Sequence, residues 1–156
     1  MNRFERFSST VFNICRYWNK IAAEEMNKHD LKAAYALYLV TMLNHGEPIT
    51  SAKLCELCGR DKADVSRAVA TFEKRGLVVR SGDKNYRAIL ELTPQGKEIA
   101  KQLNSRATLA LKMAGEGINE EGRENLYTCL DLISNNLKEI SEKGLPDGIN
   151  KADTDN

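Results

Sequence analysis

Residues 61–81 read DKADVSRAVATFEKRGLVVRS, and this stretch decides the fold. Asp61 is a residue type that favours the start of a helix, and Gly76 is one that favours its end. Between them, large apolar residues recur at steps of four and three: Val65, Val69 and Phe72. This spacing predicts an amphipathic helix over 62–75. The residues after Gly76 are mainly Leu and Val, which predicts a strand directly after the helix.

A second short helix is predicted just before this one, over residues 51–58. Thr50 or Ser51 can cap its start, and Gly59 can close it. Its inner face is expected to consist of Leu54, Leu57 and Cys58. Two short helices separated by about three residues, the second amphipathic and basic, are typical of a helix-turn-helix.

Two strands are predicted after the helix-turn-helix, over 77–81 and 86–92. The residues between them, GDKN at 82–85, all favour turns, so the two strands form a hairpin. Ile49 can add one residue of a further strand. A helix-turn-helix followed by a hairpin is a winged helix, so the predicted fold class is mainly α with a small β-hairpin wing.

Longer helices are predicted on both sides of the winged helix, over 4–26, 94–114 and 119–143. The first carries an apolar stripe made of Phe4, Phe7, Val11, Ile14, Trp18, Ile21 and Ala22. The last carries a heptad seam made of Leu126, Leu130, Ile133, Leu137 and Ile140. The first stripe has no preceding domain to pack on, so a later part of the chain or a second chain must cover it. The spacing of the last seam suits packing against another long helix. The apolar stretch 31–43 predicts a core helix.

Charge is distributed unevenly although the chain of 156 residues has a net charge of only +1. Residues 50–97 contain ten Lys and Arg against six Asp and Glu, whereas residues 119–143 contain three against six. A basic middle and an acidic end are consistent with a nucleic-acid-binding part and a separate assembly part. The chain lacks a long apolar run and a signal-like N-terminus, which predicts a cytoplasmic protein without a membrane partner.

Enzymatic, metal and cofactor functions have little support in the sequence. No phosphate-binding glycine loop and no nucleophile–base set is recognisable, and His29 and His45 are the only histidines. Cys55 and Cys58 form a C-x-x-C pair with no second pair at zinc-site spacing. The sequence therefore predicts a protein that is not an enzyme and holds no metal and no cofactor.

Three motifs carry a family resemblance: Val65-Ser66-Arg67, the helix exit EKRGLV at 73–78 and LTPQG at 92–96. Together with the order of elements they resemble the MarR family of bacterial winged-helix transcriptional regulators, over about residues 4–143. Two departures are visible. The wing lacks the family's D-x-R spacing, because Asp83 precedes Arg87 by four residues, and Arg60 stands where an apolar residue is usual.

The resemblance implies a homodimer that binds a palindromic site in double-stranded DNA and responds to a small-molecule effector or another signal. It divides the chain into an N-terminal dimerisation helix (1–30), a DNA-binding winged lobe (31–93), C-terminal dimerisation helices (94–143) and a disordered tail (144–156). Two alternatives stay open: a winged-helix protein–protein adaptor without DNA binding, and a regulator that senses oxidants through the thiol of Cys15.

The candidate DNA-binding residues lie on the polar side of the 62–75 helix, beside it and in the wing. Arg67 can bond a guanine edge with two hydrogen bonds, and Lys62 lies near a helix N-terminus that already favours phosphate. The small side chain of Ala63 lets the backbone approach DNA. The full set is Arg60, Lys62, Ala63, Ser66, Arg67, Thr71, Arg80, Lys84 and Arg87. Asp64 is expected either to complete a capping box with Asp61 or to accept a bond from a cytosine amino group.

The aromatic and Met residues of the first two helices have two interpretations. Trp18, Tyr35, Tyr38 and Met42 suit a core, and they equally suit an effector pocket between the dimer helices and the DNA-binding lobe. The four cysteines likewise suit a core, since free Cys is commonly buried. Arg16 beside Cys15 is the kind of neighbour that favours a thiolate.

Overall fold

The computed structural model describes residues 2–82 and 88–145. The elements, in order, are α1 (Arg3–Asn27), the 3-10 turn η1 (Ala33–Tyr35), α2 (Ala36–His45), β1 (Ile49–Thr50), α3 (Ser51–Cys58), α4 (Lys62–Lys74), β2 (Val78–Ser81), β3 (Ile89–Leu92), α5 (Pro94–Ala114) and α6 (Glu120–Lys143). The predicted fold class, mainly helical with a small wing, is confirmed. The chain divides into two compact units, residues 1–111 and 112–156, and each is described by itself.

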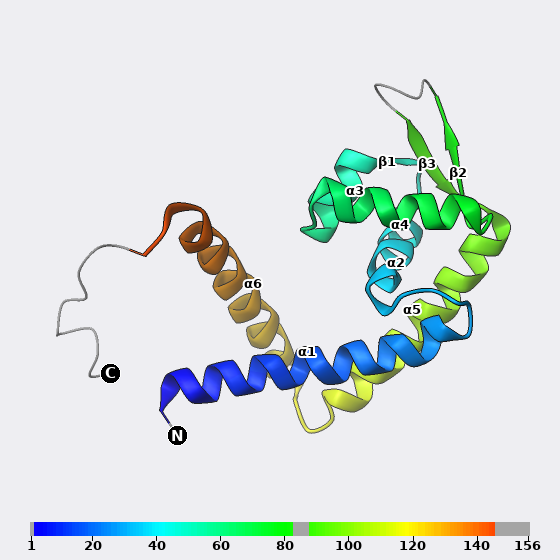
Figure 1. Cartoon of the computed structure of the whole chain (residues 1–156). Helices are drawn as coiled ribbons and strands as arrows, with labels where there is room; N and C mark the ends of the chain where they lie inside the picture. The colour runs from blue at the N-terminus through cyan, green and yellow to red at the C-terminus, as the bar shows by residue number, and fades with distance from the viewer. Residues whose placement is uncertain (1, 83–87, 146–156) are drawn as a thin grey trace. The chain divides into compact units, whose positions relative to one another are not determined.

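The helix-turn-helix has the caps that its sequence predicts. Thr50, rather than Ser51, caps α3, because its hydroxyl accepts a bond from the Lys53 amide at 3.2 Å. Gly59 closes α3 in the left-handed conformation with φ of 59°. Asp61 caps α4 by accepting from the Asp64 amide at 2.8 Å. Figure 1 shows α3, α4 and the strands gathered in one lobe, with α2 close to α4.

One predicted core position of α3 is wrong. Leu54 is fully buried, but the side chain of Leu57 is 48% exposed. Cys55 and Cys58 pack against the core instead. Residues of an α-helix are about 100° apart, so the face centred on Leu54, Cys55 and Cys58 leaves Leu57 on the outer side of Leu54.

The wing belongs to a three-stranded antiparallel sheet with the order β1-β3-β2. Ile49 pairs with Leu90 and Val78 pairs with Leu92, so the short strand expected at Ile49 is confirmed and completes the sheet. These four side chains are buried and face the helices, because alternate residues of a strand point to the same side.

Thr93 joins the end of the sheet to the start of α5. Its hydroxyl donates to the Gly76 carbonyl at 2.7 Å and accepts from the Gly96 amide at 3.0 Å. The helix predicted over 94–114 therefore begins at Pro94 as expected, and the Thr93 hydroxyl also links the exit of α4 to α5. The core itself is one apolar cluster that α1 joins only near its C-terminal end, through the fully buried Met26.

The apolar stripes of the long helices stay largely exposed in the single chain. On α1, the residues Phe4, Phe7, Val11, Ile14, Trp18 and Ile21 are all exposed. On α6, whose residues are all described, no residue is buried and the predicted seam from Leu126 to Ile140 is open. Among the described residues, no helix combines the length and apolar character that crossing a bilayer requires.

Candidate nucleic-acid interface

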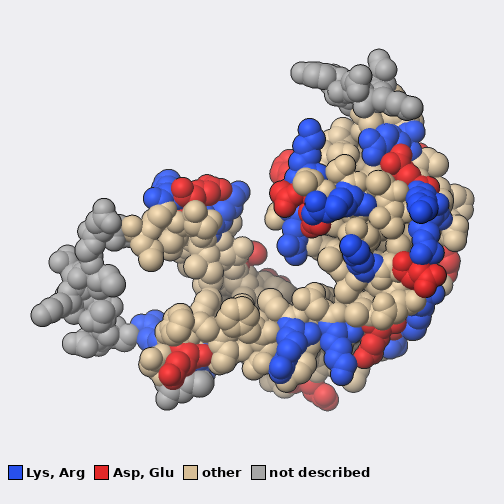
Figure 2. Space-filling model, in the orientation of Figure 1, with Lys and Arg blue, Asp and Glu red and all other residues tan. Residues whose placement is uncertain are grey.

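Helix α4 has two chemically different sides. Its inner side chains are fully buried: Val65, Ala68, Val69 and Phe72. Its outer side presents Lys62, Ala63, Ser66 and Arg67, all exposed. An α-helix of this kind fits the width of a B-DNA major groove, with its polar side directed at the bases. Figure 2 shows Lys and Arg side chains over the part of the lobe that holds α4 and the strands, with Asp and Glu among them.

Arg67 is an accessible candidate for reading a base. Its side chain is 65% exposed, and its Nη2 lies 3.4 Å from Oδ1 of Asp64. A guanidinium has five N–H donors, and a guanine edge takes two of them. The contact with Asp64 therefore leaves enough donors for a base.

The Asp64 carboxylate bonds a core tyrosine and closes no capping box, so the capping-box expectation for it is wrong. The hydroxyl of Tyr38, on α2, donates to Oδ2 of Asp64 at 2.6 Å. This bond is the main reason why the pKa of Asp64 is lowered; partial burial opposes the shift, while Arg67 and Arg60 add to it. Burial and the bond to Asp64 raise the pKa of Tyr38 far above its ordinary range. The reason for the inward turn is that a buried tyrosine hydroxyl needs a partner.

Two further candidates are held by protein partners. The guanidinium of Arg80, on β2, bonds both carboxylate oxygens of Glu73 at 3.1 Å through Nε and Nη2. The hydroxyl of Thr71 donates to the Arg67 carbonyl at 2.9 Å, and the residue is half-buried. No sequence pattern indicates the Arg80–Glu73 pair, because it forms between a helix and a strand. Lys84 and Arg87 lie outside the described residues.

A cavity of about 390 Å³ lies in the first unit, between α1, the start of α2 and α5. Its walls are mostly apolar and include Trp18, Leu37 and Val40, with Arg60 and Arg106 as basic groups. The structure thus brings Trp18 to this cavity. Tyr35 and Tyr38 do not line it: they are buried in the core, where Tyr35 meets the Phe72 ring edge-on.

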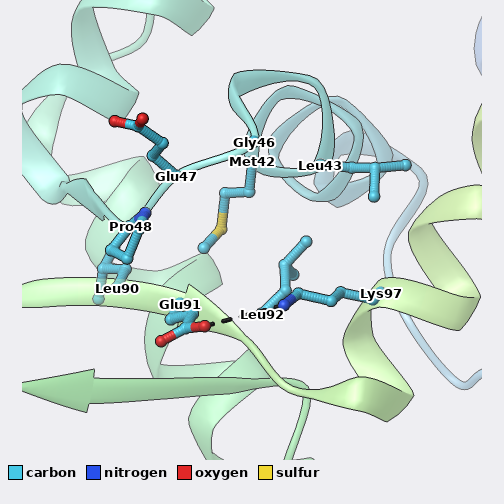
Figure 3. A pocket seen from close by; sticks show the side chains of 9 residues that line it. All are labelled: Met42, Leu43, Gly46, Glu47, Pro48, Leu90, Glu91, Leu92 and Lys97. Carbon is cyan, nitrogen blue, oxygen red and sulfur yellow. Dashed lines mark ion pairs between the residues drawn. The ribbon is translucent and has the colours of Figure 1, made fainter.

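Met42 belongs to the core and lines a different cavity of about 50 Å³ between the end of α2 and the sheet. Figure 3 shows its side chain pointing toward Leu90 and Leu92 of β3, close to the ion pair of Glu91 with Lys97 at 3.8 Å. A cavity this small holds a water or two rather than an aromatic ligand.

The cysteines fall into two environments. Cys15 is exposed on α1 and lines the larger cavity, and Cys129 is exposed on α6. Cys55 and Cys58 are half-buried, and Cys58 lies 3.4 Å from the Thr41 hydroxyl. Burial raises the pKa of the Cys58 thiol, which disfavours the reactive thiolate. Within residues 2–82 and 88–145, no group of His, Cys, Asp and Glu is arranged to hold a metal ion.

The fold is that of a winged-helix protein, since it combines a three-stranded sheet with a helix-turn-helix. The polar side of α4 is exposed, as in winged helices that place one helix in a DNA groove. Residues 29–87, which include this lobe as far as the wing, match the model of the MarR family. Over these residues the chain is similar to the MarR family.

Proteins from several bacteria resemble the chain. It is 27% identical over 106 residues to the uncharacterized HTH-type transcriptional regulator YdgJ of Bacillus subtilis, a match that spans 67% of this chain and 65% of that protein. An uncharacterized HTH-type transcriptional regulator of Bacillus cereus is 26% identical over 129 residues, or 82% of this chain and 84% of that protein.

Solved structures share the fold. A Listeria monocytogenes protein complexed with 26mer DNA superposes with a TM-score of 0.77 at 22% identity, over 96% of this chain and all of that one. The transcriptional regulator SlyA also gives a TM-score of 0.77 at 22% identity, over 87% of this chain and 96% of that one.

Proposed function

We propose that the chain is a sequence-specific, DNA-binding transcriptional regulator that places α4 in the major groove of a palindromic site. The observation that carries this proposal is the division of α4 into a fully buried inner side and an exposed outer side with Lys62, Ala63, Ser66 and Arg67. The Listeria monocytogenes structure with the same fold contains DNA, which supports the assignment.

Each outer residue has a chemical role in this proposal. Arg67 bonds a base edge, preferably guanine, while Lys62 and Ser66 bond phosphates near the helix N-terminus. Arg60, in the turn before α4, adds a phosphate contact. Arg80 contributes through Nη1, since Glu73 already holds its Nε and Nη2. Thr71 lies at the inner edge of the contact region, and Lys84 and Arg87 are assigned to the wing that enters the minor groove.

The functional unit is proposed to be a homodimer. The apolar stripes of α1 and α6 are open in one chain, and exposed apolar surfaces of this extent mark assembly faces. The interval of four and three between Leu126, Leu130 and Ile133 suits packing against another long helix. A two-fold dimer would place its two α4 helices about 34 Å apart, one turn of DNA.

A signal is proposed to act through the larger cavity. Arg60 lines that cavity and is directly followed by Asp61, the residue that caps α4. A ligand beside Arg60 would therefore contact the residue just before the cap of the DNA-binding helix. The volume of about 390 Å³ and the apolar walls suit a small organic molecule. Oxidation of Cys15, in the same wall, is the second candidate signal.

The protein is proposed to act in the cytoplasm and to have no catalytic activity of its own. The alternative from another class is an adaptor that keeps the winged helix as a scaffold. An adaptor has no reason to align Lys62 and Arg67 on one exposed side of a helix.

Selection from a pool of random duplex DNA, repeated at several salt concentrations, tests the proposal. A palindrome should be enriched, and affinity should fall steeply as salt rises. Before selection, the protein is unfolded and refolded so that any retained ligand is removed. A refolded protein that enriches no sequence and binds no duplex at low salt would exclude DNA binding and favour the adaptor.

A further inference from the structure

Three side chains form a line from the core to the outer side of α4. Tyr38 on α2 bonds Oδ2 of Asp64 at 2.6 Å, and Oδ1 of Asp64 lies 3.4 Å from Nη2 of Arg67. The two carboxylate oxygens thus point in different directions, one toward the buried tyrosine and one toward the exposed arginine. Exposure rises along the line: Tyr38 is buried, Asp64 is partly exposed and Arg67 is mostly exposed.

Tyr38 is a fixed anchor for this line. Its residue is only 1% exposed, and its ring lies 6.3 Å from that of Tyr35 in the same core. Its hydroxyl has one described partner, Asp64, and a buried hydroxyl without a partner is costly. The core therefore dictates where the Asp64 carboxylate lies.

Arg67 is the flexible end. A long arginine side chain has many rotamers, and ordering it at an interface costs conformational entropy. The carboxylate of Asp64, one turn earlier on the same helix, restricts those rotamers while using one guanidinium nitrogen. The nitrogens that remain can form the two bonds that a guanine edge accepts.

We propose that Tyr38 and Asp64 are positioning residues that set the sequence specificity of Arg67, an inference that rests on the proposed DNA binding. Tyr38 fixes Asp64, and Asp64 holds the guanidinium ready for a base. Neither residue needs to touch DNA.

The Asp64 carboxylate also lowers the affinity for DNA of arbitrary sequence. It is repelled by phosphates, and it offers Arg67 an alternative to bonding them. The pair therefore weakens binding to arbitrary DNA while it favours the base contact. Specificity is a difference between two affinities, and a repulsive group can raise it.

The decisive variant is Tyr38→Phe, because it removes the hydroxyl without changing any charge. Tyr35→Phe is the matched control: Tyr35 is another buried tyrosine of the same cluster, and its ring contacts Phe72 rather than Asp64. For each protein, affinity is measured for the duplex that the wild type selects and for that duplex with one base pair changed. The changed pair is the one whose preference Arg67→Ala removes.

Tyr38→Phe is expected to lower the discrimination between the two duplexes about threefold to tenfold, the range expected when one long side chain loses its order. Tyr35→Phe should leave discrimination at the wild-type value. Asp64→Asn should lower discrimination and also raise affinity for random duplex DNA. Adding Tyr38→Phe to Asp64→Asn should produce no further loss of discrimination, since the two residues act along one line.

If Tyr38 only stabilised the fold, a different result would be expected. In that case Tyr38→Phe lowers the melting temperature but leaves discrimination unchanged in the folded protein, which would overturn the proposal. Should Tyr38→Phe not fold, Asp64→Asn decides: unchanged discrimination overturns the proposal equally. A wild type that selects DNA with a preference insensitive to Arg67→Ala refutes this inference alone. A wild type that selects no DNA refutes the proposed function as well.

Discussion

Gly96, in the first turn of α5, lies directly against the carbonyl group of Leu77 at the entrance to β2. A Cβ atom at Gly96 would be 2.9 Å from the Leu77 carbonyl carbon and closer still to its oxygen. Thr93, three residues earlier, fastens the same junction through Gly76. In the LTPQG motif, Gly96 is thus needed because two backbones approach closely, and Thr93 because its hydroxyl links α4 to α5.

Gly96→Ala is expected to destabilise the fold, because backbone atoms rather than a mobile side chain must move. Forcing a methyl group into a packed site costs about 1–3 kcal/mol, measurable as a lower free energy of unfolding in urea. Ser105→Ala, an exposed change in the same helix, is the control and should stay within about 0.5 kcal/mol of the wild type. Equal stability of the two variants would contradict the close approach.

The bond between Tyr38 and Asp64 gives stability a defined dependence on acid. The pKa of Asp64 is lowered from its ordinary value of 3.8, mainly by the Tyr38 hydroxyl. Because the folded-state pKa is the lower one, the stabilisation is complete above the unfolded-state pKa and is lost as pH falls through the folded-state pKa. The free energy of unfolding of Asp64→Asn should therefore differ most from that of the wild type near neutral pH, and this difference should become smaller in acid.

Urea denaturation of both proteins between about pH 7 and pH 3 measures this difference. Tyr38→Phe is the informative comparison, since it leaves the carboxylate but removes the main cause of its lowered pKa. Its acid dependence should lie between those of the wild type and Asp64→Asn. Parallel curves of unfolding free energy against pH for all three proteins would show that the Tyr38 hydroxyl does not stabilise the Asp64 carboxylate.

The features that the sequence predicts correctly are those that depend on local periodicity. The limits and the buried side of α4 follow from Asp61, the spacing of Val65, Val69 and Phe72, and the glycine after the helix. The sequence does not predict which side chains meet across elements. Tyr38 and Asp64 are 26 residues apart, and no spacing rule connects a core tyrosine with a carboxylate on another helix. For the same reason the sequence does not distinguish Trp18, which lines the larger cavity, from Tyr35, Tyr38 and Met42, which do not.

Arg67 and Lys62 are expected to make different DNA contacts: Arg67 to a base edge and Lys62 to phosphate. Arg67→Ala is expected to relax the preference at one base pair, at a cost of about 1–3 kcal/mol on the preferred sequence. Lys62→Ala should weaken binding to all sequences about equally and reduce the salt dependence by about one counterion. Competition binding on sequence variants at several salt concentrations separates the two effects. A variant of Arg67 that loses affinity uniformly would mean that this residue contacts phosphate.

The seam of α6 makes a prediction about assembly. Ile133→Lys places a charge in the row of apolar residues that runs from Leu126 to Ile140, so it should dissociate a dimer that depends on that row. Asn135→Lys adds the same charge about 200° around the helix and serves as the control. Sedimentation velocity across a range of protein concentrations should show a monomer for the first variant and an unchanged dimer for the second. A wild-type monomer at all concentrations would contradict the proposed dimer.

The two candidate signals can be separated through the exposed cysteines. Cys15 lines the larger cavity of the first unit, whereas Cys129 is exposed on α6 of the second unit. If oxidation is the signal, hydrogen peroxide should lower the DNA affinity of the wild type and of Cys129→Ser, and thiol reduction should restore it. Cys15→Ser should then bind DNA equally well with and without peroxide. An affinity that peroxide leaves unchanged in all three proteins would exclude the thiol signal, and the apolar cavity beside Arg60 would remain as the place where a small molecule acts.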